Sequence, residues 1–343
     1  MTIFNKQELA SKFALVKNAI AKNSTINHLK MLNINVTGNK FKLTGGNGEM
    51  QVTVSGECIG DDVFNECVMP NTFNVMIGAT KNDINMIVKD GILSTISGKS
   101  KFNIPSIDGE MYPLIKLDGD INQFNLRELI GSVYRASASK DLRVMLTGTC
   151  IQVTGNTINA VATDGHVLMI NQHEINMDDF QIIIPNGASE YLGNNDTDGF
   201  VVSGSSLKAV STHNNLEVIT KLVDAKYVSW ERVVVDYSNK FTVNRSELID
   251  AVSTINKIEN AAHVNLKSSG ESLIISTKDG NGTSVVSEID FTGDEVNVSF
   301  NPSKLLSCLQ SIDCDEIEIS FNNESYIQSK DGSHKFFLSP MRI

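Results

Sequence analysis

The sequence of 343 residues lacks several features that would each point to a particular class of protein. Every apolar run is shorter than the ~20 residues that a membrane-spanning helix needs, and residues 1–8 hold no apolar segment of a secretory signal. The five cysteines form no CxxC pair and no zinc-like group with histidine. We therefore expect a cytoplasmic protein without a membrane partner, a disulfide framework or a metal site.

The sequence also lacks the catalytic and nucleotide-binding motifs GxSxG, HExxH and GxGxxG. Residues 98–100, Gly-Lys-Ser, resemble the end of a phosphate-binding loop, but Leu93 stands where that motif needs glycine. Asp164 and His166 could form the acid–base pair of a hydrolase, whereas the Asp164-Gly165 dipeptide between two strand-like runs favours a hairpin turn. We expect no catalytic residues and no cofactor, with a hydrolase as the alternative.

One pattern, apolar-Asn-x-x-Glu-Leu, occurs three times, beginning at Phe4, Phe124 and Val243. Such an Asn can cap a helix by accepting from a backbone N–H, and the Glu can reach back to the cap. Apolar residues follow at spacings of three and four, which place them on one helix face. The repeat predicts three long helices and three domains, with helices at 5–22, 125–140 and 244–258 and domains at 1–118, 119–237 and 238–343.

Each third also holds a second strand-like run that leads into a short helix with proline near its start. The expected short helices are at 72–81, 187–193 and 303–310. The expected strands include 31–36, 40–44, 50–54, 144–153, 273–277, 284–291 and 317–321, and the expected turns lie at 47–48, 90–91, 279–280 and 331–332. Each half-unit is therefore one helix followed by an antiparallel meander, which gives an α+β fold.

The charge is unevenly distributed. The net charge is −11, yet the three long helices hold nine basic and four acidic residues. Such segregation indicates a basic surface that attracts phosphates without reading sequence. The alternative is that an acidic protein simply has some basic helices.

Several motifs resemble one known family. Residues 161–168, Val-Ala-Thr-Asp-Gly-His-Val-Leu, are similar to the ATDGHRL signature of the bacterial DNA polymerase III β subunit, the sliding clamp. Residues 221–227 and 232–233 resemble its KLVDGRFPxYxRV segment, and 337–343 resemble its PMRL-type tail. The motifs keep their order along the whole chain.

The resemblance implies the DNA clamp fold: three similar domains, each of two helix-plus-antiparallel-sheet half-units, closing into a ring as a head-to-tail homodimer. The ring would encircle double-stranded DNA without sequence preference. It would tether the DNA polymerase catalytic subunit, and the clamp loader and other clamp-binding-motif proteins would be further partners. The alternative is a cytoplasmic interaction module that does not encircle DNA.

The resemblance also implies three sets of site residues. Partner peptides would enter a pocket between the second and third domains, formed by Leu146, Thr163, Gly165, His166, Leu168, Val228, Arg232, Val233, Pro340, Met341 and Arg342. The DNA-facing residues would be Lys6, Lys17, Lys22, Arg127, Arg135, Lys140 and Arg143. The dimer interface would include Lys99, Phe102, Ile104 and Ile258.

The chain departs from the family pattern at the expected pocket. Val167 stands in place of arginine, Val228 in place of proline, and residues 337–339, Phe-Leu-Ser, in place of Val-Val-Met. Residues 144–145, Val-Met, replace a tyrosine pair that touches DNA in some relatives. We expect a less basic pocket rim with its own peptide preference.

Overall fold

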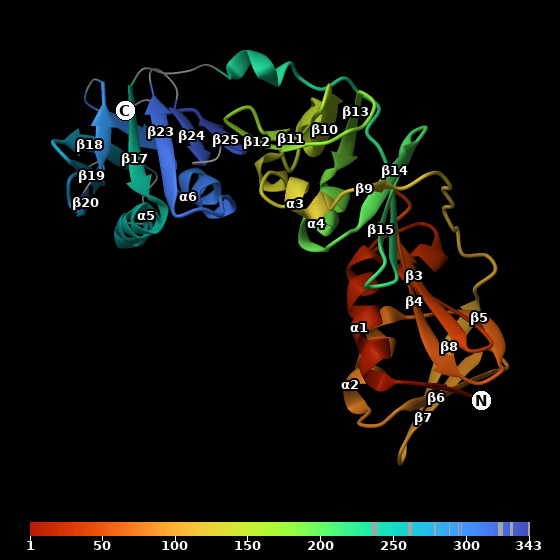
Figure 1. The fold of residues 1–343 in the computed structure, drawn as a ribbon. Coiled ribbons are helices and arrows are strands. Elements are labelled where there is room, and N and C mark those ends of the chain that lie inside the picture. The colour runs from red at the N-terminus through yellow and green to blue at the C-terminus, as the bar shows by residue number, and fades with distance from the viewer. Residues whose placement is uncertain are drawn as a thin grey trace. The chain divides into compact units, whose positions relative to one another are not determined.

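The computed structural model describes residues 1–234, 239–259, 263–277, 279–287, 289–293, 295, 297–321, 325–329 and 332–341. The chain packs into two compact units: unit 1 comprises Met1–Leu126 and Asp196–Leu222, and unit 2 comprises Arg127–Asn195 and Val223–Ile343. Both units combine helices with antiparallel sheets (Figure 1), which confirms the α+β prediction. Among the described helices, none is long and apolar enough to cross a membrane.

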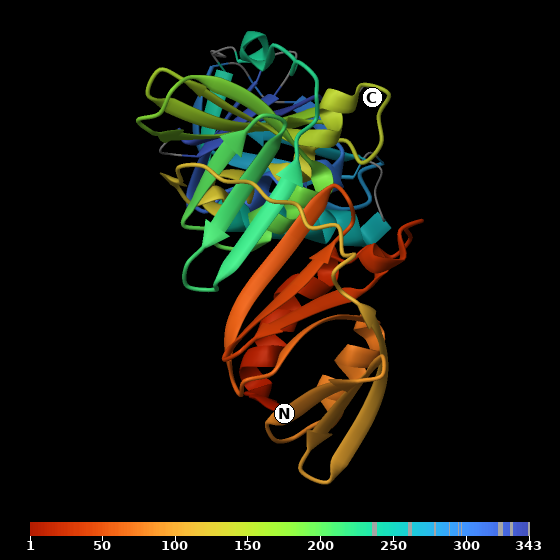
Figure 2. The same cartoon turned by 90° about the vertical axis from the view of Figure 1, so that its right-hand side faces the viewer.

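Unit 1 is a sheet with two helices on one face. Its helical elements are α1 (Lys6–Val16), η1 (Lys17–Ala19), η2 (Asn27–Lys30) and α2 (Pro70–Ala79). Its strands are β1 (Thr2–Phe4), β2 (Leu32–Thr37), β3 (Lys40–Gly46), β4 (Met50–Ile59), β5 (Val63–Val68), β6 (Ile84–Lys89), β7 (Ile92–Ser97), β8 (Ser100–Asp108), β9 (Asn122–Gln123), β14 (Gly199–Ser203), β15 (Ser206–Ser211) and β16 (Leu216–Lys221). The ribbons of α1 and α2 lie next to each other (Figure 2). The rings of Phe13 on α1 and Phe73 on α2 meet edge to face with centroids 5.2 Å apart, so the two helices share one apolar layer.

Unit 2 has two sheets. Its helical elements are α3 (Leu126–Ile130, from the last residue of unit 1), η3 (Tyr134–Ala136), η4 (Val144–Thr147), α4 (Asn186–Asn194), η5 (Trp230–Val233), α5 (Arg245–Glu259) and α6 (Pro302–Ser311). Its strands are β10 (Gly148–Thr154), β11 (Thr157–Thr163), β12 (Val167–Glu174), β13 (Phe180–Pro185), β17 (Asn239–Asn244), β18 (Val264–Ser269), β19 (Ser272–Ser276), β20 (Thr283–Ser287), β21 (Asp290–Thr292), β22 (Asn297–Phe300), β23 (Glu316–Phe321), β24 (Ser325–Ser329) and β25 (His334–Leu338).

The two large sheets repeat one strand order. Unit 1 contains the series β5-β2-β3-β4-β16-β15-β14-β9, and unit 2 contains β13-β10-β11-β12-β25-β24-β23-β17. In each series a hairpin pairs with a strand from far along the chain: β4 with β16 and β12 with β25. Half-units therefore join edge to edge, and each junction removes two open strand edges.

In two of the three predicted caps, the asparagine side chain forms the expected bond. The Asn5 carboxamide oxygen accepts from the Glu8 N–H at 3.0 Å, and that of Asn244 accepts from the Glu247 N–H at 3.1 Å. The Glu8 carboxylate accepts from the Glu57 N–H on β4 at 3.3 Å, so it also ties α1 to the sheet.

The third cap involves a residue from another strand connection. The Asn125 carboxamide oxygen accepts from the Thr197 N–H at 3.2 Å, and the Thr197 hydroxyl accepts from the Leu126 N–H at 3.0 Å. Thr197 thus supplies a cap to α3 that the local sequence pattern could not predict.

The predicted helix 125–140 is wrong over most of its length. It consists of α3 and η3. The backbone bonds change from the α-helical Gly131 N–H to Arg127 carbonyl, at 2.8 Å, to the shorter Val133 N–H to Ile130 carbonyl, at 3.0 Å. Gly131 also packs close to α4, where a Cβ atom would lie 3.1 Å from the Gly193 carbonyl oxygen. The helix 244–258 is confirmed as α5, whereas the helix 5–22 ends at Val16 and continues as η1.

The short helices predicted after each proline are confirmed as α2, α4 and α6. Two strand predictions need correction: residues 144–147 form η4, where the Thr147 hydroxyl donates to the Val144 carbonyl at 2.8 Å, and the run 284–291 contains two strands, β20 and β21. The predicted turn at 331–332 includes Asp331, which lies outside the described residues.

Replacing Asn5 with alanine tests the first cap. We expect Asn5→Ala to lower the free energy of unfolding by about 1 kcal/mol, because the Glu8 N–H loses its partner at the helix start. Urea unfolding followed by circular dichroism measures the change. Asn5→Asp keeps the acceptor and is the control; equal unfolding midpoints for Asn5→Ala and the wild type would show that the cap contributes nothing.

Candidate functional site

A pocket of about 260 Å³ lies within unit 2. One wall is the turn between β11 and β12, a second is the segment 228–233, and a third is the end of β25 with Ser339. Leu146 from η4, only 1% exposed, contributes to the lining. The side chains are mainly apolar, with few polar groups, as in sites that bind organic ligands or peptide side chains.

The turn between β11 and β12 is fixed by its own side chains. The Thr163 hydroxyl donates to the Val167 carbonyl at 2.6 Å and accepts from the Gly165 N–H at 3.0 Å. One Asp164 carboxylate oxygen accepts from the His166 N–H at 2.8 Å and the Val167 N–H at 2.9 Å. Gly165 has a φ of +88°, which glycine adopts without strain. The hairpin-turn prediction at Asp164-Gly165 is confirmed.

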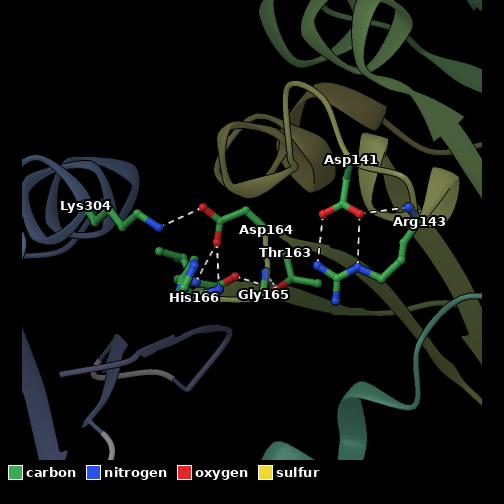
Figure 3. Close-up of polar contacts among 8 residues, drawn as sticks. Asp141, Arg143, Thr163, Asp164, Gly165, His166 and Lys304 are labelled. Carbon is green, nitrogen blue, oxygen red and sulfur yellow. Dashed lines mark hydrogen bonds and ion pairs between the residues drawn. The ribbon is translucent and has the colours of Figure 1, made fainter. Parts of the chain in front are cut away.

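The second carboxylate oxygen of Asp164 bonds to Lys304 on α6 at 2.8 Å (Figure 3). Partial burial alone would raise the pKa of the Asp164 carboxyl, but the bonds from Lys304 and from two backbone N–H groups lower it below the usual value. The bond between Asp164 and His166 comes from the His166 backbone N–H, not from its imidazole. Asp164 therefore acts as a structural anchor between the turn and α6.

The segment 228–233 carries Trp230, the only tryptophan of the chain. Its indole N–H donates to the Gln152 carboxamide oxygen at 3.2 Å, and the Gln152 amide donates to Glu231 at 3.1 Å. These bonds fix the indole at the edge of the pocket. The sequence prediction missed Trp230, although it stands where the family's segment has an aromatic tyrosine.

The structure brings together most of the residues expected in the pocket. Those that line it are Leu146, Thr163, Gly165, His166, Leu168, Val228 and Val233. Arg232 is exposed on η5 and does not line the pocket. Pro340 and Met341 are half-buried beyond the third wall, where the Met341 N–H donates to Ser299 on β22 at 2.7 Å. Arg342 lies outside the described residues.

Further lining residues come from positions where the chain departs from the family pattern. They are Val167, Phe337, Leu338 and Ser339, joined by Arg143, Ser229 and Trp230. The departures therefore lie on the pocket wall itself, where they change its shape and polarity.

The residues expected to face DNA lie in both units. Lys6, Lys17 and Lys22 belong to α1, η1 and the loop that follows, and the rest belong to the segment 127–143. All are exposed except Lys6, which is half-buried.

Arg143 differs from the other basic residues because Asp141 already binds it (Figure 3). Its guanidinium donates to both Asp141 carboxylate oxygens, at 3.0 and 2.9 Å. These bonds lower the pKa of the Asp141 carboxyl to about 2. The pair reduces the net positive charge that Arg143 could present to a phosphate, and the same side chain lines the pocket.

The residues expected at a dimer interface occupy different environments. Lys99 is exposed, Phe102 is half-buried and Ile258 is 55% exposed. Ile104 is only 1% exposed within the single chain, so its side chain belongs to the core. Only the backbone of Ile104, which is part of β8, could therefore contribute to an interface.

The described residues contain no cluster of three or more His, Cys, Asp or Glu side chains able to hold a metal ion.

Half-units joined edge to edge, with a pocket beside one junction, define the α+β fold of DNA clamps. The sequence matches the family model of the DNA polymerase III beta subunit, central domain, over residues 120–229, and that of the C-terminal domain over residues 235–333. The chain belongs to the DNA polymerase III beta subunit family.

Similar proteins cover the whole chain. The beta sliding clamp of Pseudomonas aeruginosa is 25% identical over an alignment of 369 positions, gaps included, which covers 98% of each chain. That of Vibrio cholerae is 25% identical over 281 residues, which span 76% of each chain. The crystal structure of the DNA polymerase III subunit beta from Pseudomonas aeruginosa superposes with a TM-score of 0.86 at 22% identity, covering 100% of both chains. The sliding clamp of Bacillus subtilis gives a TM-score of 0.89 at 19% identity, covering 100% of this chain and 99% of that one.

Replacing Asp164 with asparagine tests its role as an anchor. We expect Asp164→Asn to lower the free energy of unfolding by about 1 kcal/mol at pH 7, because the charged bond to Lys304 is lost. Since the folded-state pKa of Asp164 is lowered, the difference from the wild type should be full above the ordinary aspartate pKa of ~3.9 and vanish as the pH falls through the folded-state value.

Urea unfolding followed by Trp230 fluorescence at pH 7 and pH 3 measures this difference. Lys304→Met should show the same loss at pH 7. Lys240→Met, which removes the more exposed pair with Glu318, is the matched control. An equal loss at both pH values would mean that the ionised carboxylate is not the source of the stabilisation.

Proposed function

We propose that this chain is a DNA sliding clamp: two copies close head to tail into a ring around duplex DNA and tether a polymerase. The observation that carries the proposal is the family match across the central and C-terminal domains, together with beta sliding clamps similar over 98% of the chain. We also propose three domains, at 1–118, 119–237 and 238–343, supported by the repeated strand order of the sheets.

The ring would hold DNA through phosphates alone. Exposed lysine and arginine side chains on and after α1 and α3 can attract the backbone without reading bases, which suits a protein that must slide. Such a role is topological and needs no catalytic group. The bonds of Asp164 to its own turn and to Lys304 support a non-enzymatic function.

The pocket of unit 2 would bind short peptides of partner proteins in the cytoplasm. The partners would be the DNA polymerase catalytic subunit, the clamp loader and other proteins with a clamp-binding motif. The apolar walls suit leucine and aromatic side chains, and the fixed indole of Trp230 offers a flat surface for stacking.

Two open strand edges support a head-to-tail seam. Within the described chain, residues 100–105 of β8 pair on one side only, with β7. β20 is an edge of the four-stranded sheet, and β22, the other edge, is partly covered by the bond from Met341. Pairing β8 of one copy with β20 of the other would satisfy both edges. Ile258 lies close to the start of β20, because a Cβ atom built on Gly282, the residue before this strand, would be 3.2 Å from the Ile258 side chain. This location supports a role for Ile258 at the seam.

Retention on circular DNA tests the ring. After loading onto nicked circles by a clamp loader, the protein should stay bound at salt concentrations that remove ordinary phosphate contacts, and it should dissociate when the same circles are cut. Gel filtration of labelled protein with DNA measures both states. Loss from circles and linear DNA alike, with a known clamp as positive control, would favour an interaction module that does not encircle DNA.

Ile258→Asp tests the seam. Because Ile258 is 55% exposed in the single chain, the variant should fold, but an unpaired charge buried at the interface should weaken dimerisation at least about a hundredfold. Analytical ultracentrifugation measures the mass, and Phe102→Asp should act in the same way. Val75→Asp, which alters a 66% exposed side chain on α2, is the control. A dimer of wild-type affinity in both seam variants would exclude this seam.

A further inference from the structure

Unit 1 holds a pocket of about 360 Å³ that none of the predicted sites includes. Leu29 of η2 and Met50 of β4 form its buried part, both less than 10% exposed. The segment 112–115 and Lys221 at the end of β16 form its rim. Leu114 on this rim is 50% exposed, so apolar surface is open to solvent.

This pocket is built from the same elements as the pocket of unit 2. The unit 1 pocket lies between η2, the β3–β4 turn, a segment that follows a buried tyrosine, and the end of β16. The unit 2 pocket lies between η4, the β11–β12 turn, a segment that follows a buried tyrosine, and the end of β25. The tyrosines are Tyr112 and Tyr227, 5% and 3% exposed.

The two turns share their hydrogen bonds. The Asn47 carboxamide oxygen accepts from the backbone N–H groups two and three residues on, at 2.9 and 2.8 Å. The Asp164 carboxylate accepts from the equivalent groups at 2.8 and 2.9 Å. The next residues, Gly48 and Gly165, have φ values of +94° and +88°. Asn47 and Asp164 are thus counterparts.

The short helices correspond in the same way. The Leu29 carbonyl accepts from the Ala21 N–H at 3.1 Å, and the Leu146 carbonyl accepts from the Ala138 N–H at 2.8 Å. The pairs Ala21 and Ala138, Leu29 and Leu146, Asn47 and Asp164, and Gly48 and Gly165 are each 117 residues apart, and the two tyrosines are 115 apart. The pocket of unit 1 is therefore the internal repeat of the pocket of unit 2, and the agreement of bond after bond shows that its shape is built into the fold.

Two differences set the chemistry of the unit 1 pocket. The Gln51 side chain accepts from the Ile115 N–H at 2.7 Å and donates to the Ile115 carbonyl at 3.1 Å, which fixes the rim segment against β4. Lys221 occupies the strand end that Leu338 occupies in unit 2. Among the described side chains, none forms an ion pair with Lys221, so its ammonium is available to an incoming carboxylate.

We propose that the unit 1 pocket binds a short extended peptide segment with apolar side chains and one carboxylate. The apolar side chains would lie over Leu29 and Met50, and the carboxylate would meet Lys221. This inference rests on the peptide-binding role proposed for the unit 2 pocket. A clamp subunit would then offer two peptide sites of different charge preference.

Three probe peptides test the proposal: acetyl-Leu-Phe with a free C-terminal carboxylate, its C-terminal amide, and acetyl-Asp-Leu-Phe amide. The methyl NMR signal of Met50, assigned by a Met50→Leu variant, reports the unit 1 pocket. Trp230 fluorescence, from the only tryptophan, reports the unit 2 pocket. Both peptides with a carboxylate should shift the Met50 signal saturably. Acetyl-Leu-Phe amide, which has no carboxylate, should bind about threefold more weakly. A response to only one carboxylate peptide would identify which source, terminal or side-chain, the pocket takes.

Three variants make the test specific. Lys221→Gln should abolish the preference for a carboxylate, whereas Lys116→Gln, with the same charge change next to the rim segment 112–115 but outside the pocket lining, should keep it. Leu114→Asp should block binding at the rim without unfolding the chain, because the side chain is already exposed.

The two readouts separate this proposal from the peptide role of unit 2. A Trp230 response without any Met50 shift would overturn peptide binding by the unit 1 pocket and leave the role of the unit 2 pocket intact. A Met50 shift without a Trp230 response would support peptide binding by the unit 1 pocket and would argue against a peptide role for the unit 2 pocket. Silence of both signals, or a carboxylate preference that survives Lys221→Gln, would overturn the proposal made here.

Discussion

Edge-to-edge pairing of strands from distant parts of the chain is the constraint on which this structure depends. In unit 2 the ladder from Val167↔Leu338 to Asn171↔His334 joins a hairpin to the end of the last repeat, and β4 with β16 makes the same junction in unit 1. An open edge exposes unpaired N–H and C=O groups, so each junction protects two edges at once. The junctions also create concave sites, because the strand ends, the hairpin turn and the connecting segment meet there.

The sequence predicted the features that short-range chemistry determines. The Asn5 and Asn244 caps, the Asp164-Gly165 turn and the proline-led short helices need only residues close in sequence. The sequence-based prediction failed where contacts between distant parts of the chain determine the local structure. The helix after Asn125 ends at Ile130, next to the point where Gly131 packs against α4, and Thr197, from another connection, shares the cap. Strand alternation could not tell that the β8 face carrying Ile104 is the buried one.

The candidate site was predictable as a set of residues but not as a surface. Motif resemblance placed Leu146, Thr163 and Val233 together, and these do line one pocket. It did not reveal Trp230, whose position depends on a bond to Gln152 on β10. It also assigned Arg143 to DNA alone, since the paired carboxylate of Asp141 and the location at the pocket emerge only in three dimensions.

The third wall of the unit 2 pocket has a consequence for synthesis of the chain. Phe337, Leu338 and Ser339 belong to that wall, whereas the turn facing them ends at Val167, about half the chain earlier. A ribosome must therefore make residue 339 before this pocket exists. A molecule that needs all three walls can therefore bind only a chain that extends at least to Ser339. The junction of β12 with β25 in this way makes formation of the pocket depend on the synthesis of two segments that are far apart in the sequence.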